Sequence, residues 1–206
     1  MPLSIEVLPG NGDSLLKGAK VDVVSCHFSR ERHEHVPARF HGGLEIGVSY
    51  ETFDEAGGDM YALQPLRPLD PAVPPCRMCR DPGGPWGILV ADVSGKGIPG
   101  SLVMSMARAF IRMEAEGGRN TSPSDTLTRA NRMLAQDIKK GMFVTALYCI
   151  LNRKNHEIRV ASAGHNPMVV WRAAANKIDL VNPSGIALGF DKGAVFERTI
   201  KEEKVV

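Results

Sequence analysis

The chain has 206 residues, of which 43% are hydrophobic and 23% charged, and a formal net charge of +2. This balance is typical of a soluble globular protein with one main core. It excludes a partner bound mainly by charge, such as nucleic acid or an anionic membrane surface. No apolar run approaches the ~20 residues of a membrane span, and the N-terminus lacks the pattern of a signal peptide, so we expect a cytoplasmic protein.

Composition divides the chain into regions. Residues 1–40 give weak patterns and are treated as a lead-in of uncertain structure, and residues 41–206 are predicted to form one domain. Half of the 14 prolines fall between Tyr61 and Trp86, and because proline cannot donate a backbone hydrogen bond, we expect neither helix nor sheet there. We interpret about 64–85 as an insertion between two neighbouring strands, and loops of this length tend to be functional or mobile.

Four cysteines do not make a disulfide framework in a chain of this length. Cys149 lies in an apolar run and is expected to be a small buried side chain. Cys76 and Cys79 form a C-x-x-C pair within the insertion. Two interpretations are open for them: a pair of surface thiols, or a zinc site completed by Cys26, His27, His33 and His35. The surface pair is favoured, because no second C-x-x-C or suitably spaced histidine pair accompanies them.

Two acidic residues stand beside glycines near predicted strands. The first, Asp59, follows Gly58 and an alternating apolar pattern that predicts a strand starting at residue 44. The second, Asp92, follows the apolar run 86–90 and precedes a glycine-rich turn. Such a turn can bind phosphate through its N–H groups, but a carboxylate repels phosphate unless a cation lies between them. The pattern therefore predicts a metal site that meets phosphate through the metal.

Two helices are predicted after the glycine-rich turn. The first covers residues 101–116 and is expected to pack on a sheet through Leu102, Met106, Ala109 and Met113. Ser122 as N-cap, with Pro123 and Asp125 in the first turn, predicts the start of the second. Its apolar face is formed by Leu127, Ala130, Leu134 and Ile138, and Gly141 ends it. The short loop between the helices indicates an antiparallel hairpin.

Five short apolar segments follow without intervening helices, at residues 143–151, 157–163, 168–171, 177–181 and 194–201. They predict antiparallel strands, so the expected fold class is α/β (α+β): a layered sandwich of mainly antiparallel sheets with a helical hairpin. A doubly wound parallel sheet is disfavoured. His165 lies in the tightest turn between these strands, and because no nucleophile motif accompanies it, we interpret it as a structural residue of the turn.

Five blocks occur in one order along residues 43–206, and they carry a family resemblance. They are Gly57-Gly58-Asp59, Asp92-Val93-Ser94-Gly95-Lys96-Gly97-Ile98-Pro99, Met142-Phe143-Val144-Thr145, Ser162-Ala163-Gly164-His165-Asn166-Pro167, and the stretch from Gly185 to Gly189. Together they resemble the metal-dependent protein phosphatases (PPM, PP2C-like) of the SpoIIE/RsbU type. The resemblance implies an α-β-β-α sandwich, two Mn²⁺ or Mg²⁺ ions, and hydrolysis of phosphoserine or phosphothreonine on a partner protein. In this branch the partner is typically an anti-sigma-factor antagonist.

The resemblance also assigns roles to individual residues. Asp92 would bridge the two metals, the backbone carbonyl of Val93 would bind one of them, and Asp59 would be a ligand of that same ion, partly through water. Hard oxygen ligands suit both Mn²⁺ and Mg²⁺. A metal-activated water would be the nucleophile, so the cysteines and His165 have no required part.

This sequence also departs from the family pattern. Ala62 stands where a further aspartate is common, and Lys96 where histidine is common. The chain stops before the strands that carry two more metal-binding aspartates in the family, so the domain is expected to be truncated at its C-terminus. We therefore expect one metal site at most, little or no turnover by this polypeptide alone, and an open sheet edge that favours a homodimer.

Two other classes of function are left open by the sequence. One is a non-catalytic module that keeps the phosphatase fold in order to bind a phosphoprotein or to dimerise. The other is a zinc-dependent redox or regulatory module centred on Cys76 and Cys79.

Overall fold

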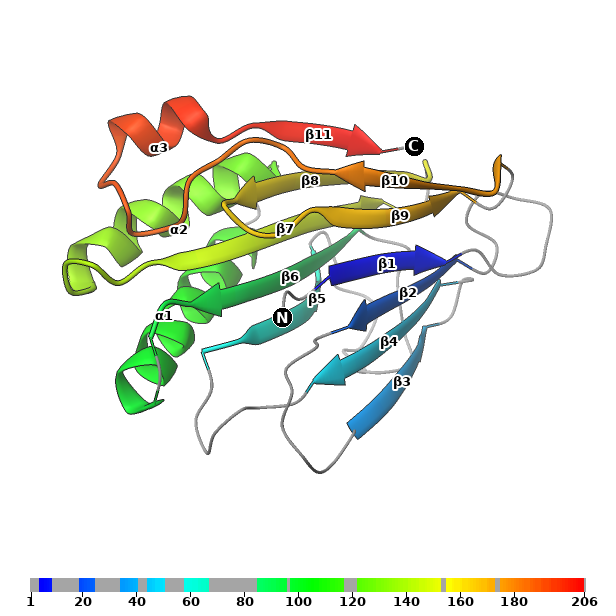
Figure 1. Cartoon of the computed structure of the whole chain (residues 1–206), viewed down its shortest axis with the longest axis horizontal. Helices are drawn as coiled ribbons and strands as arrows, with labels where there is room; N and C mark the ends of the chain where they lie inside the picture. Colours follow the sequence, from blue (N-terminus) through cyan, green and yellow to red (C-terminus); the bar gives the residue numbers. More distant parts are fainter. Residues whose placement is uncertain are drawn as a thin grey trace, which may run out of the picture.

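The computed structural model describes the chain in ten segments that together form a layered sandwich (Figure 1). The described residues are 4–8, 19–24, 34–40, 44–50, 58–66, 85–95, 97–116, 122–152, 155–172 and 175–205. The cysteine pair Cys76 and Cys79, together with Cys26 and Lys96, lies outside them.

One layer is a five-stranded sheet in the order β11-β8-β7-β6-β5, and each neighbouring pair in it is antiparallel. Its strands are β5 (Met60–Pro65), β6 (Trp86–Val93), β7 (Val144–Asn152), β8 (Glu157–Ala163) and β11 (Glu202–Val205). The central strands β6 and β7 are buried almost throughout. Their apolar composition therefore reflects a strand covered on both faces, as predicted for residues 143–151.

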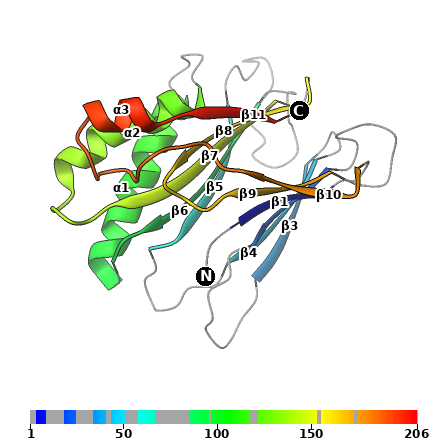
Figure 2. The ribbon, with the colours of Figure 1, turned by 45° about the horizontal axis from the view of Figure 1, so that its top comes forward.

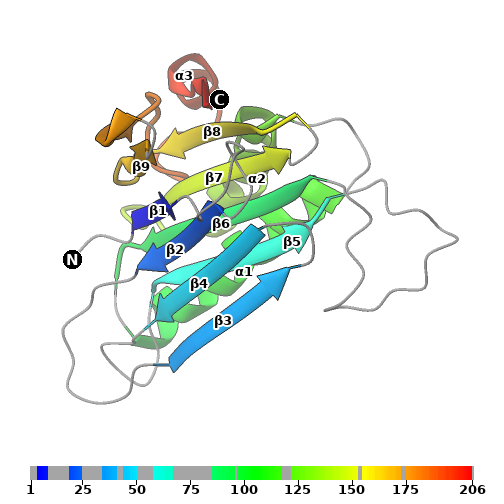
Figure 3. The ribbon, with the colours of Figure 1, turned by 90° about the vertical axis from the view of Figure 1, so that its right-hand side faces the viewer.

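The second layer is a six-stranded sheet in the order β10-β9-β1-β2-β4-β3 (Figure 3). Its strands are β1 (Ser4–Leu8), β2 (Ala19–Val24), β3 (Glu34–Phe40), β4 (Leu44–Tyr50), β9 (Met168–Arg172) and β10 (Lys177–Val181). The pairs β1 with β9 and β2 with β4 are parallel, and the others are antiparallel. Three strands of this sheet come from residues 1–40.

The helices lie on the face of the five-stranded sheet that points away from the second sheet (Figure 2). They are α1 (Gly97–Glu116), α2 (Pro123–Asp137) and the short α3 (Ala194–Thr199). The predicted sandwich of mainly antiparallel sheets is thus confirmed, and three of its four layers lie within the described residues. None of the helices in that part of the chain is both long and apolar enough to cross a membrane.

Strand β6 contributes to two hydrophobic cores, because successive side chains of a strand point to opposite faces. Ile88 and Val90 pack between the two sheets, in a cluster that also contains Met168 and Val170 of β9. Leu89, Ala91 and Val93 pack instead under the helices. This double anchoring fixes the end of β6, and the alternation places Asp92 on the face directed toward the second sheet.

The packing face of α1 differs from the prediction. The helix buries Gly100, Val103, Ala107, Ile111 and Ala115, whereas Leu102 and Met113 are 61% and 58% exposed. The chain carries two stripes of apolar residues at helical spacing, and the stripe with more small side chains faces the sheet. Small side chains let the helix axis approach the sheet closely, which accounts for the choice.

Helix α2 follows its sequence signals closely. Ser122 is the N-cap, its side chain accepts a hydrogen bond from the Asp125 N–H at 3.0 Å, and Pro123 opens the helix. Leu127, Ala130 and Leu134 are buried, as predicted. The helix ends at Asp137, with Ile138 as C-cap, so it stops before the predicted Gly141.

Two predictions of secondary structure were wrong. Residues 194–199 form α3 rather than a strand, because the Asp191 carboxylate accepts hydrogen bonds from the N–H groups of Gly193, Val195 and Phe196 and so starts a helix. The proline-rich region begins with a strand, β5, whose pairing extends to Pro65 opposite Trp86. Because β5 is the last strand of the sheet among those described, a proline without an N–H is tolerated there.

Candidate functional site

Asp59 and Asp92 are brought side by side by the pairing of β5 with β6. The antiparallel register aligns Met60 with Ala91, so the next step along both strands sets Asp59 opposite Asp92. The pairing continues past this point, since the Val93 N–H donates to the Gly58 carbonyl at 3.2 Å. Directly opposed residues of an antiparallel pair have Cβ atoms about 4.5–5.5 Å apart. Two carboxylates therefore share one end of the sheet.

Both carboxylates lie on the face of the sheet that packs against the second sheet. Asp59 shares a face of β5 with Tyr61 and Leu63, which pack against the core between the sheets. Asp92 shares a face of β6 with Val90 in the same way. Asp92 is exposed and Asp59 is half-buried. The site is thus the polar, accessible end of an apolar face, where carboxylates can bind a cation without a large desolvation cost.

The backbone next to Asp92 is held at close range by Gly58. A Cβ atom added at Gly58 would lie 2.9 Å from the Val93 carbonyl oxygen and 3.3 Å from the Val93 Cβ. Real side chains do not tolerate the first of these distances, so glycine is required here. The Val93 carbonyl, the predicted third ligand, consequently belongs to the same compact corner as the two aspartates.

The turn after β6 is tied to the start of β7. The Ser94 N–H donates to the Phe143 carbonyl at 2.9 Å, and the Phe143 N–H donates to Ser94 Oγ at 2.7 Å. These two bonds prolong the β6–β7 ladder by one residue and limit the movement of the Asp92 backbone. Ser94 was singled out by the sequence only as part of the motif that follows Asp92.

Thr145 and His165 form a polar link beside Asp92. Thr145 pairs with Asp92 across the β6–β7 ladder, and its hydroxyl lies 3.4 Å from the Asp92 carbonyl oxygen and 2.9 Å from His165 Nδ1. His165 is only 8% exposed, and its N–H donates to Ser162 Oγ at 3.1 Å. His165 thus contacts Ser162 of its own turn and Thr145 of β7. Contacts of this kind hold the turn in place.

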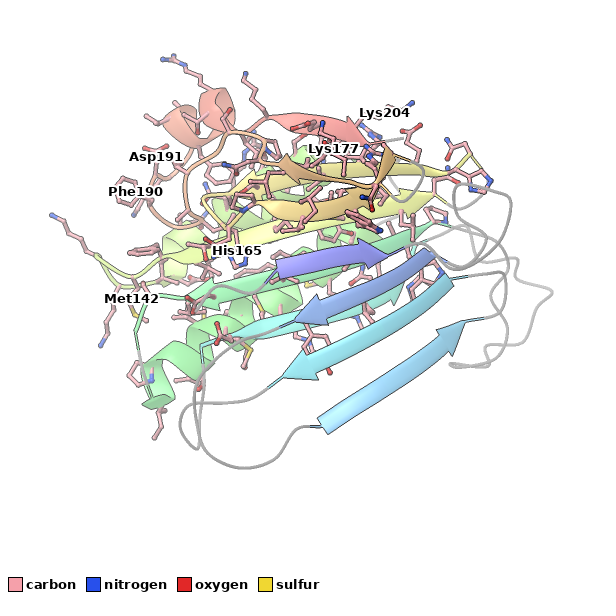
Figure 4. The ribbon with its side chains drawn as sticks, turned by 45° about the vertical axis from the view of Figure 1, so that its right-hand side comes forward. Met142, His165, Lys177, Phe190, Asp191 and Lys204 are labelled. Atoms are coloured by element: carbon pink, nitrogen blue, oxygen red, sulfur yellow. The ribbon has the colours of Figure 1, made fainter. Side chains whose placement is uncertain are left out.

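A loop on the same end of the molecule is held by a buried asparagine. Asn131 of α2 is 1% exposed, its Oδ1 accepts from the Gly189 N–H at 2.7 Å, and its Nδ2 donates to the Asp191 carbonyl at 2.9 Å. Figure 4 shows Phe190 and Asp191 at the end of the molecule that also carries Met142, where β6 ends and β7 begins. Phe190 is 73% exposed there. The sequence pattern of α2 does not distinguish Asn131 from a surface residue, and its role was missed.

The donor set of the site fits a hard divalent cation. Two carboxylates and one backbone carbonyl are the oxygen ligands that Mn²⁺ and Mg²⁺ prefer, and an exposed site leaves room for water as further ligands. Within the described ranges, no group of three or more His, Cys, Asp or Glu side chains is placed to hold a metal ion. Asp59, Asp92 and the Val93 carbonyl are the candidate ligands that the strand register brings to this corner.

The fold is that of PP2C phosphatase domains. The PP2C domain of SpoIIE from Bacillus subtilis gives a TM-score of 0.56 at 14% identity, over 84% of this chain and 40% of that chain. The SiaA-PP2C domain of Pseudomonas aeruginosa gives 0.54 at 18% identity, over 75% and 52%. The RsbU and RsbW domains of a Mycobacterium tuberculosis protein give 0.54 at 24% identity, over 73% and 37%.

Comparison of the sequence identifies the family to which the chain belongs. Residues 82–203 match the family described as Stage II sporulation protein E (SpoIIE), and because the match covers more than half of the chain, the protein belongs to that family. A relative, "Phosphoserine phosphatase RsbU" of Bacillus subtilis (strain 168), is 35% identical over 105 residues, which are 51% of this chain and 31% of the relative. The chain thus spans about a third of the length of this relative. The resemblance to the SpoIIE/RsbU branch is confirmed.

Proposed function

We propose that Asp59 and Asp92 of this chain form a metal site of a metal-dependent protein serine/threonine phosphatase, which acts on phosphoserine or phosphothreonine of a partner protein. The observation that carries the proposal is the β5–β6 register, which sets the two aspartates opposite each other at one end of the sheet. Family membership and the name of the RsbU relative, a phosphoserine phosphatase, support the same chemistry.

The residues of the chain have distinct parts in this proposal. Asp92, on the central strand β6, and Asp59, directly before β5, would hold Mn²⁺ or Mg²⁺ together with the Val93 carbonyl. Such a cation, when bound, supplies positive charge that offsets the phosphoryl oxygens and makes a water molecule more acidic. Ser94 and its bonds to Phe143 keep the Asp92 corner in place. A site whose ligands do not move spends no binding energy on ordering them.

We further propose that turnover by this polypeptide alone is low. Two carboxylates and one carbonyl supply few ligands for a two-ion centre, and the described residues add no third acidic, histidine or cysteine side chain to them. The partner we propose is a phosphorylated anti-sigma-factor antagonist, in keeping with the SpoIIE family and its RsbU member.

The test is hydrolysis of a phosphoserine peptide by the full chain with Mn²⁺, with Mg²⁺ and with a chelator. We expect slow, metal-dependent release of phosphate that falls at least roughly 100-fold in Asp92→Asn and Asp59→Asn. Asp125→Asn is the matched control, because Asp125 lies in the first turn of α2, away from the paired strands. Undiminished activity in Asp92→Asn would contradict the proposed site.

The same preparations distinguish the two alternatives left open by the sequence. A non-catalytic module of phosphatase fold would bind the phosphopeptide without releasing phosphate under any metal condition. A zinc module around Cys76 and Cys79 would copurify with stoichiometric zinc, and it would lose that zinc in the double variant of those cysteines.

A further inference from the structure

A cavity of about 400 Å³ lies along β5 and has Asp59 in its lining. It is lined by Asp59, Met60, Tyr61, Ala62, Leu63, Met104 and Arg108. Because the strand residues in this set point to both faces of β5, the cavity wraps around the edge of the sheet rather than lying on one face of it. Its volume falls within the range of sites that bind small ligands or single side chains of a partner.

The lining of the cavity follows β5 from Asp59, one residue of the candidate metal site. Five consecutive residues of the chain from Asp59 to Leu63 line it, which corresponds to about 13 Å along an extended strand. Strand β5 is antiparallel to β6 and starts beside Asp59, so it runs away from the site. Helix α1 follows β6 in the chain and also runs away from the site (Figure 3). Arg108, one turn further along α1 than Met104, therefore lies toward the end of the cavity remote from Asp59.

The two ends of the cavity differ in charge. Asp59 gives one end a carboxylate, and Arg108 gives the other a guanidinium. Arg108 is exposed and makes no ion pair or hydrogen bond with the part of the chain that the structure describes. The next arginine along the same side of the helix, Arg112, is instead paired with Glu116 at 2.8 Å. Arg108 is thus available to an anionic group from outside, whereas Arg112 already has a carboxylate partner.

We propose that this cavity is a docking subsite for an acidic side chain of the phosphoprotein substrate, with Arg108 as the residue that selects it. The proposal rests on the proposed function, because it places the phosphorylated residue at the Asp59 end. A carboxylate can make two parallel hydrogen bonds with a guanidinium, and the methylene groups of an aspartate or glutamate fit the apolar wall of Met104, Ala62 and Leu63. The phosphorylated residue occupies the Asp59 end, so that carboxylate is left to the Arg108 end.

The dimensions predict where the acidic residue lies in the substrate. An extended peptide advances about 3.3 Å per residue, so the length of the cavity corresponds to about four residues. An acidic side chain about four positions from the phosphoserine would therefore reach Arg108. Substrates with such a residue on the correct side would bind more tightly than those with alanine there.

The experiment measures peptide binding rather than turnover, so that it does not depend on catalysis. Labelled peptides carry a non-hydrolysable phosphonate analogue of phosphoserine, and a single glutamate is moved through each flanking position up to about five residues away in an alanine background. Binding to the full chain is followed by fluorescence polarisation with Mn²⁺ present. The proteins are the unmodified chain, Arg108→Ala, Arg108→Lys and the matched control Arg112→Ala.

We expect a glutamate about four residues from the phosphonate to lower the Kd roughly three- to tenfold. This preference should vanish in Arg108→Ala, return in part in Arg108→Lys and persist in Arg112→Ala. A preference that survives in Arg108→Ala, the absence of any positional preference, or the absence of peptide binding would each overturn the proposal. Arg108-dependent binding in a chain that shows no metal-dependent hydrolysis would instead contradict the proposed function alone.

Discussion

Gly58 is the residue on which the compactness of the aspartate corner depends. An added Cβ would lie 2.9 Å from the Val93 carbonyl, which is a backbone atom and cannot turn aside as a flexible side chain can. Gly58→Ala must therefore push β5 away from the end of β6. Asp59 would move with it, because it is the next residue in the chain.

We predict that Gly58→Ala lowers the free energy of unfolding by about 1–3 kcal/mol and weakens Mn²⁺ binding. Urea denaturation measures the first effect and calorimetric titration the second. Gly193→Ala is the control, since nothing lies within 4 Å of a Cβ added there. Equal effects of the two substitutions would show that space at Gly58 is not the reason for the glycine.

The Asp191 carboxylate accepts hydrogen bonds from N–H groups at the start of helix α3, and these bonds lower its pKa. Hydrogen bonds from the Gly193 and Phe196 N–H groups are the main causes that hold the pKa of this carboxyl below its ordinary value, and the Val195 N–H adds to them. A lowered pKa in the folded state means that the stabilisation is present above the unfolded value of about 3.9 and is lost as the pH falls through the folded value.

We predict that the Asp191 carboxyl titrates below about pH 3.9 in the folded chain, and that the Gly193 and Phe196 amide signals shift with it. An NMR titration observes both. In Asp191→Asn the side chain keeps an acceptor oxygen but has no charge to titrate, so the pH dependence of these amides should disappear. Titration at or above the ordinary value would contradict the capping role.

At the scale of elements, α2 shows how far local signals determine a helix. The Ser122 side chain accepts from the Asp125 N–H, Pro123 opens the helix, and three predicted apolar residues are buried. Ser105 provides a contrast on α1, because its hydroxyl only donates to the Ser101 carbonyl within the helix at an exposed position.

We predict that Ser122→Ala destabilises the chain by about 1 kcal/mol, whereas Ser105→Ala changes its stability little. Chemical denaturation of both variants beside the unmodified chain tests this. Similar losses in the two variants would mean that the N-cap bond does not contribute.

Strand β7 is covered on both faces, and Cys149 within it is fully enclosed. Burial raises the pKa of this thiol to about 12, so almost no thiolate exists near neutral pH. We predict that Cys149 resists iodoacetamide at about pH 8 in the folded chain and reacts once the chain is unfolded in urea. Peptide mapping by mass spectrometry follows Cys149 individually. Rapid alkylation in the folded state would contradict the described packing.

The elements differ in how well their sequences predicted them. Strands β8 and β10 were predicted with their observed bounds because turn residues isolate short apolar runs. The prediction for the packing face of α1 was wrong because the helix carries two stripes of apolar residues. The sequence does not show which of the two packs on the sheet. Strand β5 was missed because the prolines that follow it predict a loop. Pro65 is nevertheless tolerated in it, because β5 is the last strand of the sheet among those described.

The same limits apply to the site. The two aspartates could be chosen from the sequence because each stands beside glycines and because the motif blocks recur in one family. The family resemblance implied that they lie close together, but the local sequence patterns could not show it, because their adjacency depends on the register of a strand that those patterns missed. Asn131, Thr145 and Arg108 gain their roles only from segments distant in the chain, and local patterns carry no signal of such contacts.

At the scale of the whole molecule, the two sheets make the site possible together. The core between them anchors β6 through Ile88 and Val90, and the helices anchor the other face, so that Asp92 is presented from a rigid strand. Asp59 directly precedes β5, and residues of β5 line the cavity beside it. Asp92 lies on a central strand, and Asp59 lies beside the last strand of the sheet among those described. A cation held between them would be accessible to a substrate from the side of the sheet.

The central claim is that Asp59 and Asp92 jointly form one divalent cation site. Titration of Mn²⁺ into the full chain, followed by loss of the free Mn²⁺ electron paramagnetic resonance signal, measures it most directly, with Asp59→Asn, Asp92→Asn and the control Asp125→Asn in parallel. We predict one weak site in the unmodified chain and in the control, and its loss in both site variants. Mn²⁺ binding that is unchanged in either Asp59→Asn or Asp92→Asn would contradict the account.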